Sequence, residues 1–169
     1  CQGFHVHAFH TPRYLREVIL PAIAQGTASV GRTRADVQMT CGIFVVTGAN
    51  DAEIAANANT IKAQIAFYAS TPSYEAVMQL HGWEALTVKL NEMSKRNRWG
   101  EMADLITDEM LHEFAVVAPY DQLAKRVRER YDGLLDRVAY YFPFESNLSE
   151  AQMALWRDAV AVLSDTKHA

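Results

Sequence analysis

Three histidines lie within six positions near the start of the chain, in the stretch "GFHVHAFHTP". His5 and His7 are two residues apart, so on a β-strand both side chains would point to the same face. A His-x-His pair of this kind can hold a catalytic metal on a βα barrel when later strands supply further ligands. Metal-dependent hydrolases built on such barrels also need more histidines on later strands and an aspartate at the end of the last strand.

The rest of the chain does not supply those ligands. The remaining histidines are His81 and His112 in predicted helices and His168 in the tail, and the last predicted strand ends in "YYFPFE" without an aspartate. We therefore expect no metal site, and a metal-dependent hydrolase is the least favoured function. We interpret His5 as a packed residue near the strand start, hydrogen-bonded to backbone.

His10 and Thr11 stand where the first predicted strand passes into a helix. Thr11 is a typical N-cap and Pro12 a typical first helical residue. Strand-to-helix junctions carry the active sites of βα barrels. Thr11, the backbone N–H groups after it and Arg13 could form an anion site at the helix start. Equally, Thr11 could serve only as a cap, and the sequence leaves both interpretations open.

Four stretches have the composition of strands, and helical patterns alternate with them. The strands are predicted over residues 4–9, 37–47 and 134–144, with a short, weaker one in "FAVVAP". The first helix starts at Pro12, and Pro21 predicts a kink or an early end. The helix after residue 50 starts with a capping box and has a regular apolar face, formed by Ile54, Ala58, Ile61, Ile65 and Tyr68. Strand–helix alternation predicts an α/β fold with a parallel sheet.

Two further helices complete the pattern. One is predicted from Pro119 to Tyr131 and ends before Gly133. The last follows a Ser149–Gln152 capping box, and its inner face is predicted to consist of Leu155, Ala159 and Val162.

Residues 70–113 interrupt the alternation, because they read as helices with no strand between them. We expect them to form a helical insertion before the last strand, within a single domain that spans residues 1–169. A (β/α)8 TIM barrel takes eight strands and about 250 residues, so the chain supplies a partial barrel of about three to four βα units. The chain also begins at Cys1 rather than at a methionine, and we expect it to be part of something longer.

A partial barrel leaves the edges of its first and last strands without a partner. Proteins normally cover or pair such edges. The sequence therefore predicts either a missing N-terminal half-barrel or self-association into a homo-oligomer.

Composition narrows the possible partners. The 169 residues are 50% hydrophobic and 21% charged, with a net charge of −4, so no overall positive field favours nucleic acid or an anionic membrane. No apolar run approaches the roughly 20 residues that span a bilayer. Only two cysteines occur, which indicates a reducing compartment such as the cytoplasm. The basic run Lys125, Arg126, Arg128 and Arg130 reads as a solvated helix face. Nor is there a glycine-rich phosphate loop, a Gly-x-Ser-x-Gly elbow or a Cys-x-x-Cys pair.

Several segments together resemble the C-terminal half of luciferase-like oxidoreductases. They are "GFHVHAFHTPRYLREVILPAIAQG", "FVVTG", "QIAFYASTPSYEAVMQLHGW" and "DRVAYYFPF". The most specific parts are "FHTPRYL" and "FYASTPSY" with the "HGW" that follows. The resemblance covers nearly all of the chain up to Phe144 and is strongest to the branch that uses the deazaflavin coenzyme F420.

The resemblance implies a (β/α)8 barrel with its insertion before the last strand. It also implies hydride transfer between F420, or alternatively FMN, and a small organic substrate, in dimers or larger assemblies. In such proteins most cofactor contacts come from the N-terminal strands, so the resemblance implies that this chain alone lacks most of the cofactor site and binds no cofactor by itself. Carried over residue by residue, the resemblance suggests six pocket-lining residues and no catalytic residue: Phe9, His10, Thr11, Tyr68, His81 and Trp83. We assign His10 and Thr11 to the cofactor, together with Arg13 from the anion site at the helix start. We assign Phe9, Tyr68, His81 and Trp83 to the substrate.

Two functions from different classes thus stand ahead of the metal-dependent hydrolase. The first is part of a luciferase-like, F420-dependent oxidoreductase or monooxygenase. The second is a non-catalytic half-barrel that associates with another copy through its strand edges.

Overall fold

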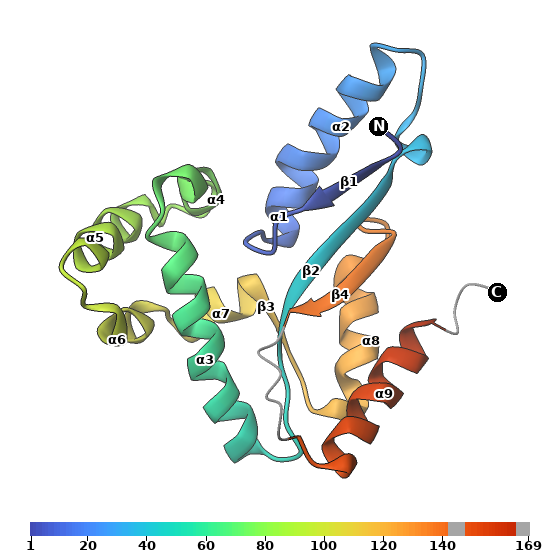
Figure 1. The fold of residues 1–169 in the computed structure, drawn as a ribbon. Coiled ribbons are helices and arrows are strands. Elements are labelled where there is room, and N and C mark those ends of the chain that lie inside the picture. Colours follow the sequence, from blue (N-terminus) through green and yellow to red (C-terminus); the bar gives the residue numbers. More distant parts are fainter. Residues whose placement is uncertain (142–147, 165–169) are drawn as a thin grey trace.

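The computed structural model describes residues 1–141 and 148–164, which form one parallel sheet with helices on both of its faces (Figure 1). The strands are β1 (Gly3–Val6), β2 (Gln38–Val46), β3 (Ala115–Val117) and β4 (Arg137–Tyr141). All three of the others pair with β2, and all run parallel to it. The α/β prediction is confirmed.

The register shows how three strands share the two edges of β2. Thr40 and Cys41 pair with β1 and also with β4, so these two strands lie on opposite edges. Phe44 pairs with Ala115 of β3 and with Tyr141 of β4. The short strand β3 therefore continues along the same edge of β2 where β1 has stopped. The strand order across the sheet is therefore β1, β2, β4, and β3 lies on the β1 side of β2, beyond the end of β1.

The helical segments follow one another as the strand–helix alternation requires. They are α1 (Pro12–Tyr14), η1 (Leu15–Ile19), α2 (Leu20–Ala28), η2 (Arg34–Asp36), α3 (Asp51–Ala69), η3 (Pro72–Tyr74), α4 (Glu75–Leu80), α5 (Glu84–Lys95), α6 (Trp99–Met102), η4 (Ala103–Leu105), α7 (Asp108–Phe114), α8 (Tyr120–Tyr131) and α9 (Glu150–Ser164). Residues 70–113 contain helices and no strand among the described residues, as the sequence pattern indicates.

Two hydrophobic cores lie on opposite faces of the sheet. Alternate residues of β2 divide between them: Cys41, Ile43 and Val45 belong to the core that α8 and α9 cover. Phe44 and Val46 belong to the core that α3 and the insertion cover. Figure 1 shows this division, with α3 to α7 on one side of β2 and α8 and α9 on the other. Burial on both faces explains why residues 37–47 read as a nearly continuous apolar run.

The first helix passes through Pro21 instead of ending there. Residues Leu15–Ile19 form a π-helical turn between α1 and α2, and Pro21 occupies the first turn of α2. A proline cannot donate the i→i−4 hydrogen bond, and the wider π turn just before it absorbs that interruption. The prediction of an early end was wrong.

The predicted caps are confirmed by hydrogen bonds. The Thr11 hydroxyl accepts from the Tyr14 N–H, and the Asn50 side chain accepts from the Glu53 N–H. Ser149 and Gln152 form the reciprocal bonds of a capping box. These short-range patterns were readable from sequence because a cap needs only neighbouring residues.

The strand ends and one helix face differ from expectation. β1 stops at Val6 rather than Phe9, because the edge of β2 beyond Cys41 passes to β3. The last strand is described over Arg137–Tyr141, and the predicted residues 142–144 lie outside the described residues. In α9 the buried residues are Trp156 and Ala159, while Leu155 and Val162 are exposed.

None of the helices within residues 1–141 and 148–164 is long and apolar enough to cross a membrane.

Gly48, in the turn from β2 to α3, provides a test of this packing. A Cβ atom at Gly48 would lie 2.7 Å from the Glu53 Cβ and 2.8 Å from the Ile54 nitrogen. Both atoms belong to the first turns of α3 and cannot move aside. We expect Gly48→Ala to lower the free energy of unfolding by about 1–3 kcal/mol, as overpacking does.

Gly26→Ala is the matched control, because nothing lies within 4 Å of that position inside α2. We expect it to leave stability unchanged or to raise it by up to about 1 kcal/mol. Urea denaturation followed by circular dichroism measures both. Equal unfolding midpoints for Gly48→Ala and the wild type would contradict the packing described.

Candidate functional site

Five aromatic or imidazole rings gather at the carboxyl ends of the strands, and we call them the aromatic rim. They are His7, Phe9, Tyr68, Tyr74 and Tyr141. His7 and Phe9 lie in the loop after β1, Tyr68 at the end of α3, Tyr74 at the end of η3 and Tyr141 at the end of β4. Segments more than sixty residues apart thus meet at the end of the sheet that carries active sites in βα barrels.

The rings of the rim are in direct contact. His7 stacks on Tyr74 with ring centroids 4.7 Å apart and an interplanar angle of 24°. Tyr68 meets His7 edge-on at 4.9 Å and Phe9 at 5.9 Å. Phe44 of β2 supports the rim from the core, 5.3 Å from the ring of Tyr141. The rim is therefore a packed cluster rather than a set of independent side chains.

Hydrogen bonds determine which nitrogen of His7 carries its proton. The Phe9 N–H donates to His7 Nδ1 at 3.1 Å, so Nδ1 is an acceptor. In the neutral ring the hydrogen must then be on Nε2, which lies 3.2 Å from the Tyr74 hydroxyl. Burial, and secondarily the neighbouring His5, lower the pKa of His7 and favour this neutral form. The Tyr74 oxygen accepts from His7, which leaves its own hydrogen available to a ligand.

The hydroxyls of Tyr68 and Tyr141 lie 3.1 Å apart. Only one of them can donate to the other, so the accepting hydroxyl keeps a hydrogen for a further partner. Burial, together with the Tyr141 hydroxyl, raises the pKa of Tyr68 to about 12. Tyr68 is consequently a neutral donor at physiological pH.

The rim is accessible from solvent. His7 is exposed and Tyr141 is 40% exposed, while Tyr68 and Tyr74 are half-buried. A ligand could therefore reach ring faces and hydroxyl groups that the fold holds in place.

Four of the other predicted site residues lie together where the first helix meets the end of α4. They are Thr11, Arg13, His81 and Trp83. Thr11 Oγ1 lies 2.8 Å from His81 Nε2, and His81 stacks on Trp83 with ring centroids 4.5 Å apart. Arg13 donates to the Leu80 carbonyl and pairs with Glu17. These contacts join the start of α1 to the end of α4, behind the rim. Thr11 is completely buried.

His10 lies apart from the rim and from this junction, because its ring lies in the core between β2 and α8. It is 1% exposed, with Nδ1 bonded to the His7 carbonyl at 3.0 Å. Its ring lies 5.7 Å from that of Tyr131 and 3.5 Å from the Cys41 sulfur. Burial, and to a smaller extent the Arg130 charge, lower the pKa of His10 to about 4 against the opposing effect of the backbone hydrogen bonds.

The histidine motif at the chain start is divided by the structure. His5 is exposed and bonds the Thr40 hydroxyl at 2.9 Å, so the prediction of a packed residue bonded to backbone was wrong. His5 and its neighbour Thr40 point to the same face of the sheet as Phe44 and Val46, which we call the inner face, and His5 is exposed there. Within the described residues, no three His, Cys, Asp or Glu side chains are grouped so that they could hold a metal ion.

Sequence reasoning placed Phe9 and Tyr68 in the site but missed His7, Tyr74 and Tyr141 as members of it. Tyr74 belongs to the "FYASTPSY" segment and Tyr141 to the end of the last strand, so both positions carried a signal. Their association depends on the insertion folding back over the strand ends, and no spacing along the chain reveals it.

The burial of neutral His10 predicts a pH dependence of stability. Below the ordinary histidine pKa of 6.5 the unfolded chain takes up a proton that the folded chain refuses until about pH 4. The unfolded state binds more protons in that window, so stability falls as the pH falls. The corresponding loss is about 3 kcal/mol.

We expect His10→Asn, whose amide can still donate to the His7 carbonyl, to have a shallower dependence by about that amount. Urea unfolding at several pH values between 7 and 4 measures the difference between the two proteins. If the unfolding free energies of the two proteins fell in parallel from pH 7 to 4, His10 would take up its proton in the folded chain as readily as in the unfolded chain, which would contradict the prediction.

Comparison with known proteins finds relatives over most of this chain. The model of the luciferase-like monooxygenase family matches residues 1–137. The uncharacterized proteins Rv1360 of Mycobacterium tuberculosis and Mb1395 of Mycobacterium bovis are each 46% identical over 136 residues. That match covers 80% of this chain but only 40% of each relative, so the chain spans well under half of their length.

A solved structure shows the same architecture. The coenzyme F420-dependent tetrahydromethanopterin reductase of Methanopyrus kandleri superposes with a TM-score of 0.65 at 18% identity, over 82% of this chain and 38% of that one. At this identity the likeness concerns the fold, and it confirms the partial barrel predicted from the strand–helix alternation. Since the family model matches most of its length, the chain belongs to the luciferase-like monooxygenase family.

Proposed function

We propose that this chain is the C-terminal part of an F420-dependent oxidoreductase, with FMN as the alternative cofactor. The reaction is hydride transfer between the cofactor and a small organic substrate. The observation that carries the proposal is the aromatic rim at the carboxyl ends of β1 and β4. Its His7 and Tyr141 are exposed, Tyr68 and Tyr74 are half-buried, and Phe9 is buried. Family membership and the F420-dependent structural neighbour support the choice of cofactor.

The rim has the chemistry that a flavin-type ring requires. A planar, largely apolar ring binds beside flat side chains, and polar groups at its margin fix its orientation. Tyr141 and His7 offer exposed ring faces, while the Tyr74 hydroxyl and the Tyr68–Tyr141 pair offer hydrogens. A deazaflavin or flavin supplies the hydride chemistry when bound.

The chain's own residues have positioning roles in this proposal. Tyr68 forms part of the wall against which the ligand lies, and the buried Phe9 packs behind it, with ring centroids 5.9 Å apart. Thr11, Arg13, His81 and Trp83 support that wall by joining α1 to α4. His10 contributes to the core that holds the loop after β1. Because every group of the rim is neutral, it orients a ligand and donates hydrogen bonds rather than attacking it.

We also place the protein in the cytoplasm. Cys1 and Cys41 are free thiols in the structure, and a reducing compartment keeps thiols in that state.

Variants of Tyr141 test the cofactor site. We expect Tyr141→Ala to weaken F420 binding about threefold to tenfold, the loss that one aromatic contact produces. Tyr141→Phe keeps the ring and loses only the hydroxyl, so it is the matched control and should bind nearly as the wild type does. Quenching of F420 fluorescence on titration measures both, with FMN titrated in parallel.

Two outcomes would count against the proposal. Absence of saturable binding of both F420 and FMN to the wild-type chain would remove the cofactor role from this chain. Equal affinities of the wild type and Tyr141→Ala would move the binding site away from the rim.

A specific observation favours a second candidate, a half-barrel that associates with another copy of itself. The outer edges of β1 and β4 have no strand beside them among the described residues. On the inner face of the sheet, His5, Arg137, Ala139 and Tyr141 are exposed. Unpaired parallel strands with an uncovered face are a ready surface for another sheet.

Sedimentation velocity distinguishes this candidate. A self-associating half-barrel should sediment as a dimer, and Ala139→Lys, which adds a charge to the inner face, should shift it towards monomer. Val88→Lys adds the same charge on α5, where Val88 is 58% exposed, and should leave the dimer intact. A wild-type chain that is monomeric at every concentration would exclude self-association.

A further inference from the structure

We infer a second ligand site outside the aromatic rim, an arginine pocket that binds a small oxyanion such as a phosphate or carboxylate group. The pocket has a volume of about 480 Å³. It lies between the start of the first helix and the ends of α4, α7 and α8. Its charged and titratable lining residues are Arg13, Arg16, Arg130, His81, Glu113 and Glu129.

The charges of the lining do not cancel within the pocket. Arg13 is neutralised by Glu17, with which it pairs at 2.9 Å. Glu129 is occupied in the same way by Lys125 and Arg126, at 3.8 and 3.3 Å.

Two guanidinium groups then remain, those of Arg16 and Arg130, against the single carboxylate of Glu113. Arg16 has no ion pair among residues 1–141 and 148–164. Positive charge is left over, and it attracts an anion.

Arg130 provides the most specific evidence. One terminal nitrogen donates to the Glu113 carbonyl, and the guanidinium carbon lies 5.8 Å from the ring centre of Tyr131. These contacts hold the guanidinium plane in one orientation. Its Nε is buried beside Tyr131, whereas its other terminal nitrogen, Nη1, makes no hydrogen bond within the described part of the chain and is not buried. That nitrogen is free to donate to a ligand in the pocket, and guanidinium groups fit oxyanions.

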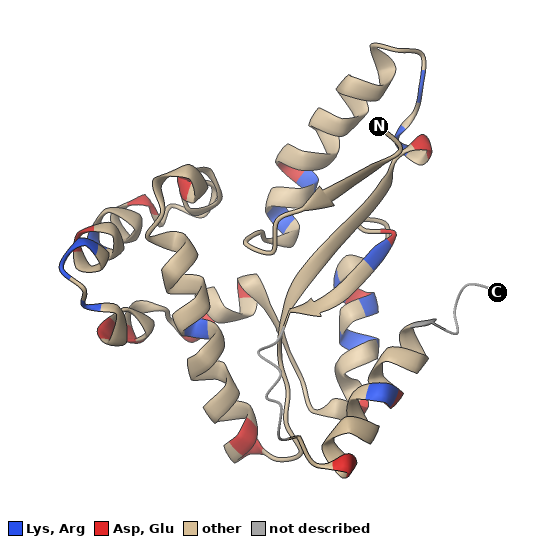
Figure 2. Ribbon diagram, viewed as in Figure 1, with Lys and Arg blue, Asp and Glu red and all other residues tan. Residues whose placement is uncertain are grey.

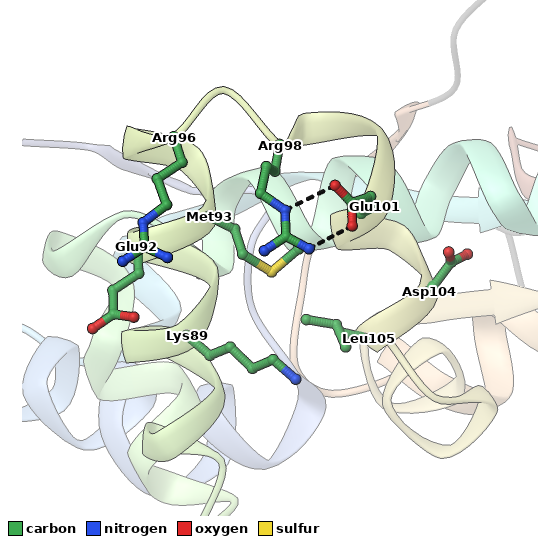
Figure 3. Close-up of a pocket in the computed structure, with 8 residues that line it drawn as sticks. All are labelled: Lys89, Glu92, Met93, Arg96, Arg98, Glu101, Asp104 and Leu105. Atoms are coloured by element: carbon green, nitrogen blue, oxygen red, sulfur yellow. Dashed lines mark hydrogen bonds and ion pairs between the residues drawn. The ribbon is translucent and has the colours of Figure 1, made fainter.

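A second pocket shows what a self-compensated site looks like (Figure 3). Its volume is about 400 Å³, and it lies between α5 and α6. Arg98 is bound there by both oxygens of Glu101, at 2.8 and 2.5 Å. Besides this pair, Lys89 and Arg96 line the pocket together with Glu92 and Asp104. In total, three basic residues face three acidic ones. No charge is left over for a ligand, in contrast to the arginine pocket.

The position of the arginine pocket separates it from the rim. Figure 2 shows basic residues at the start of the first helix and along α8, the elements that form the pocket. None of the five rim residues lines it. His81, which lines the pocket, bonds Thr11, and neither residue belongs to the rim. The inference therefore does not rest on the proposed function.

Calorimetric titration with inorganic phosphate, without F420 or FMN, tests the pocket. We expect saturable binding of one phosphate per chain and a loss of affinity of about tenfold in Arg16→Ala, the effect of removing one charged hydrogen bond. Arg16 is exposed, so the variant should fold. Arg130→Gln should weaken binding at least as much, and circular dichroism checks that it folds.

Arg98→Ala is the matched control, because it removes an arginine from the other pocket and should bind phosphate as the wild type does. A parallel titration with succinate tells a phosphate site from a carboxylate site, and saturation by either supports the inference. Absence of saturation with both anions would overturn it. Equal phosphate affinities of the wild type, Arg16→Ala and Arg98→Ala would overturn it as well.

Discussion

The central strand β2 is hydrogen-bonded along both of its edges, and the position of every other element depends on it. β1 and β3 share one edge in succession, and β4 takes the other. Because Ile43, Phe44, Val45 and Val46 are fully buried between the two cores, this part of β2 must be apolar without interruption. The same constraint ends β1 at Val6 and turns the chain there, which places His7 and Phe9 at the end of the sheet.

The insertion converts that scaffold into a site. Helix α3 leaves the carboxyl end of β2, and the short helices after it return to β3 beside the same strand. Tyr68 and Tyr74 are thereby laid over the loop after β1, and Tyr141 reaches them from β4. A network of ring contacts and hydroxyl bonds fixes neutral donors at the strand ends. Charged groups are held apart from it, in the pocket behind α1.

Much of the fold was predictable from local pattern. The strand–helix order, the caps at Thr11 and Asn50 and the helical character of residues 70–113 depend on neighbouring residues. Pro21 did not end its helix, because a π turn directly before it absorbs the interruption. A distant contact decided α9, which turned Trp156 rather than Leu155 inward, against Tyr120 and Tyr140. Phe9 and Tyr68, which the sequence suggested as site residues, lie in the rim, whereas Tyr74 joins it through the insertion and Tyr141 through β4.

The sequence by itself determined the class of fold and its family, because periodicity, capping residues and a few specific segments are properties of the chain taken in order. It also determined that no local catalytic motif is present. Only the tertiary structure decided what the early histidines do. His5 bonds a threonine at the surface, His7 joins the rim, and His10 is buried and neutral. Three identical side chains within six residues differ in this way because the chain turns at Val6. As a result, solvent surrounds His5, aromatic rings surround His7, and the core surrounds His10.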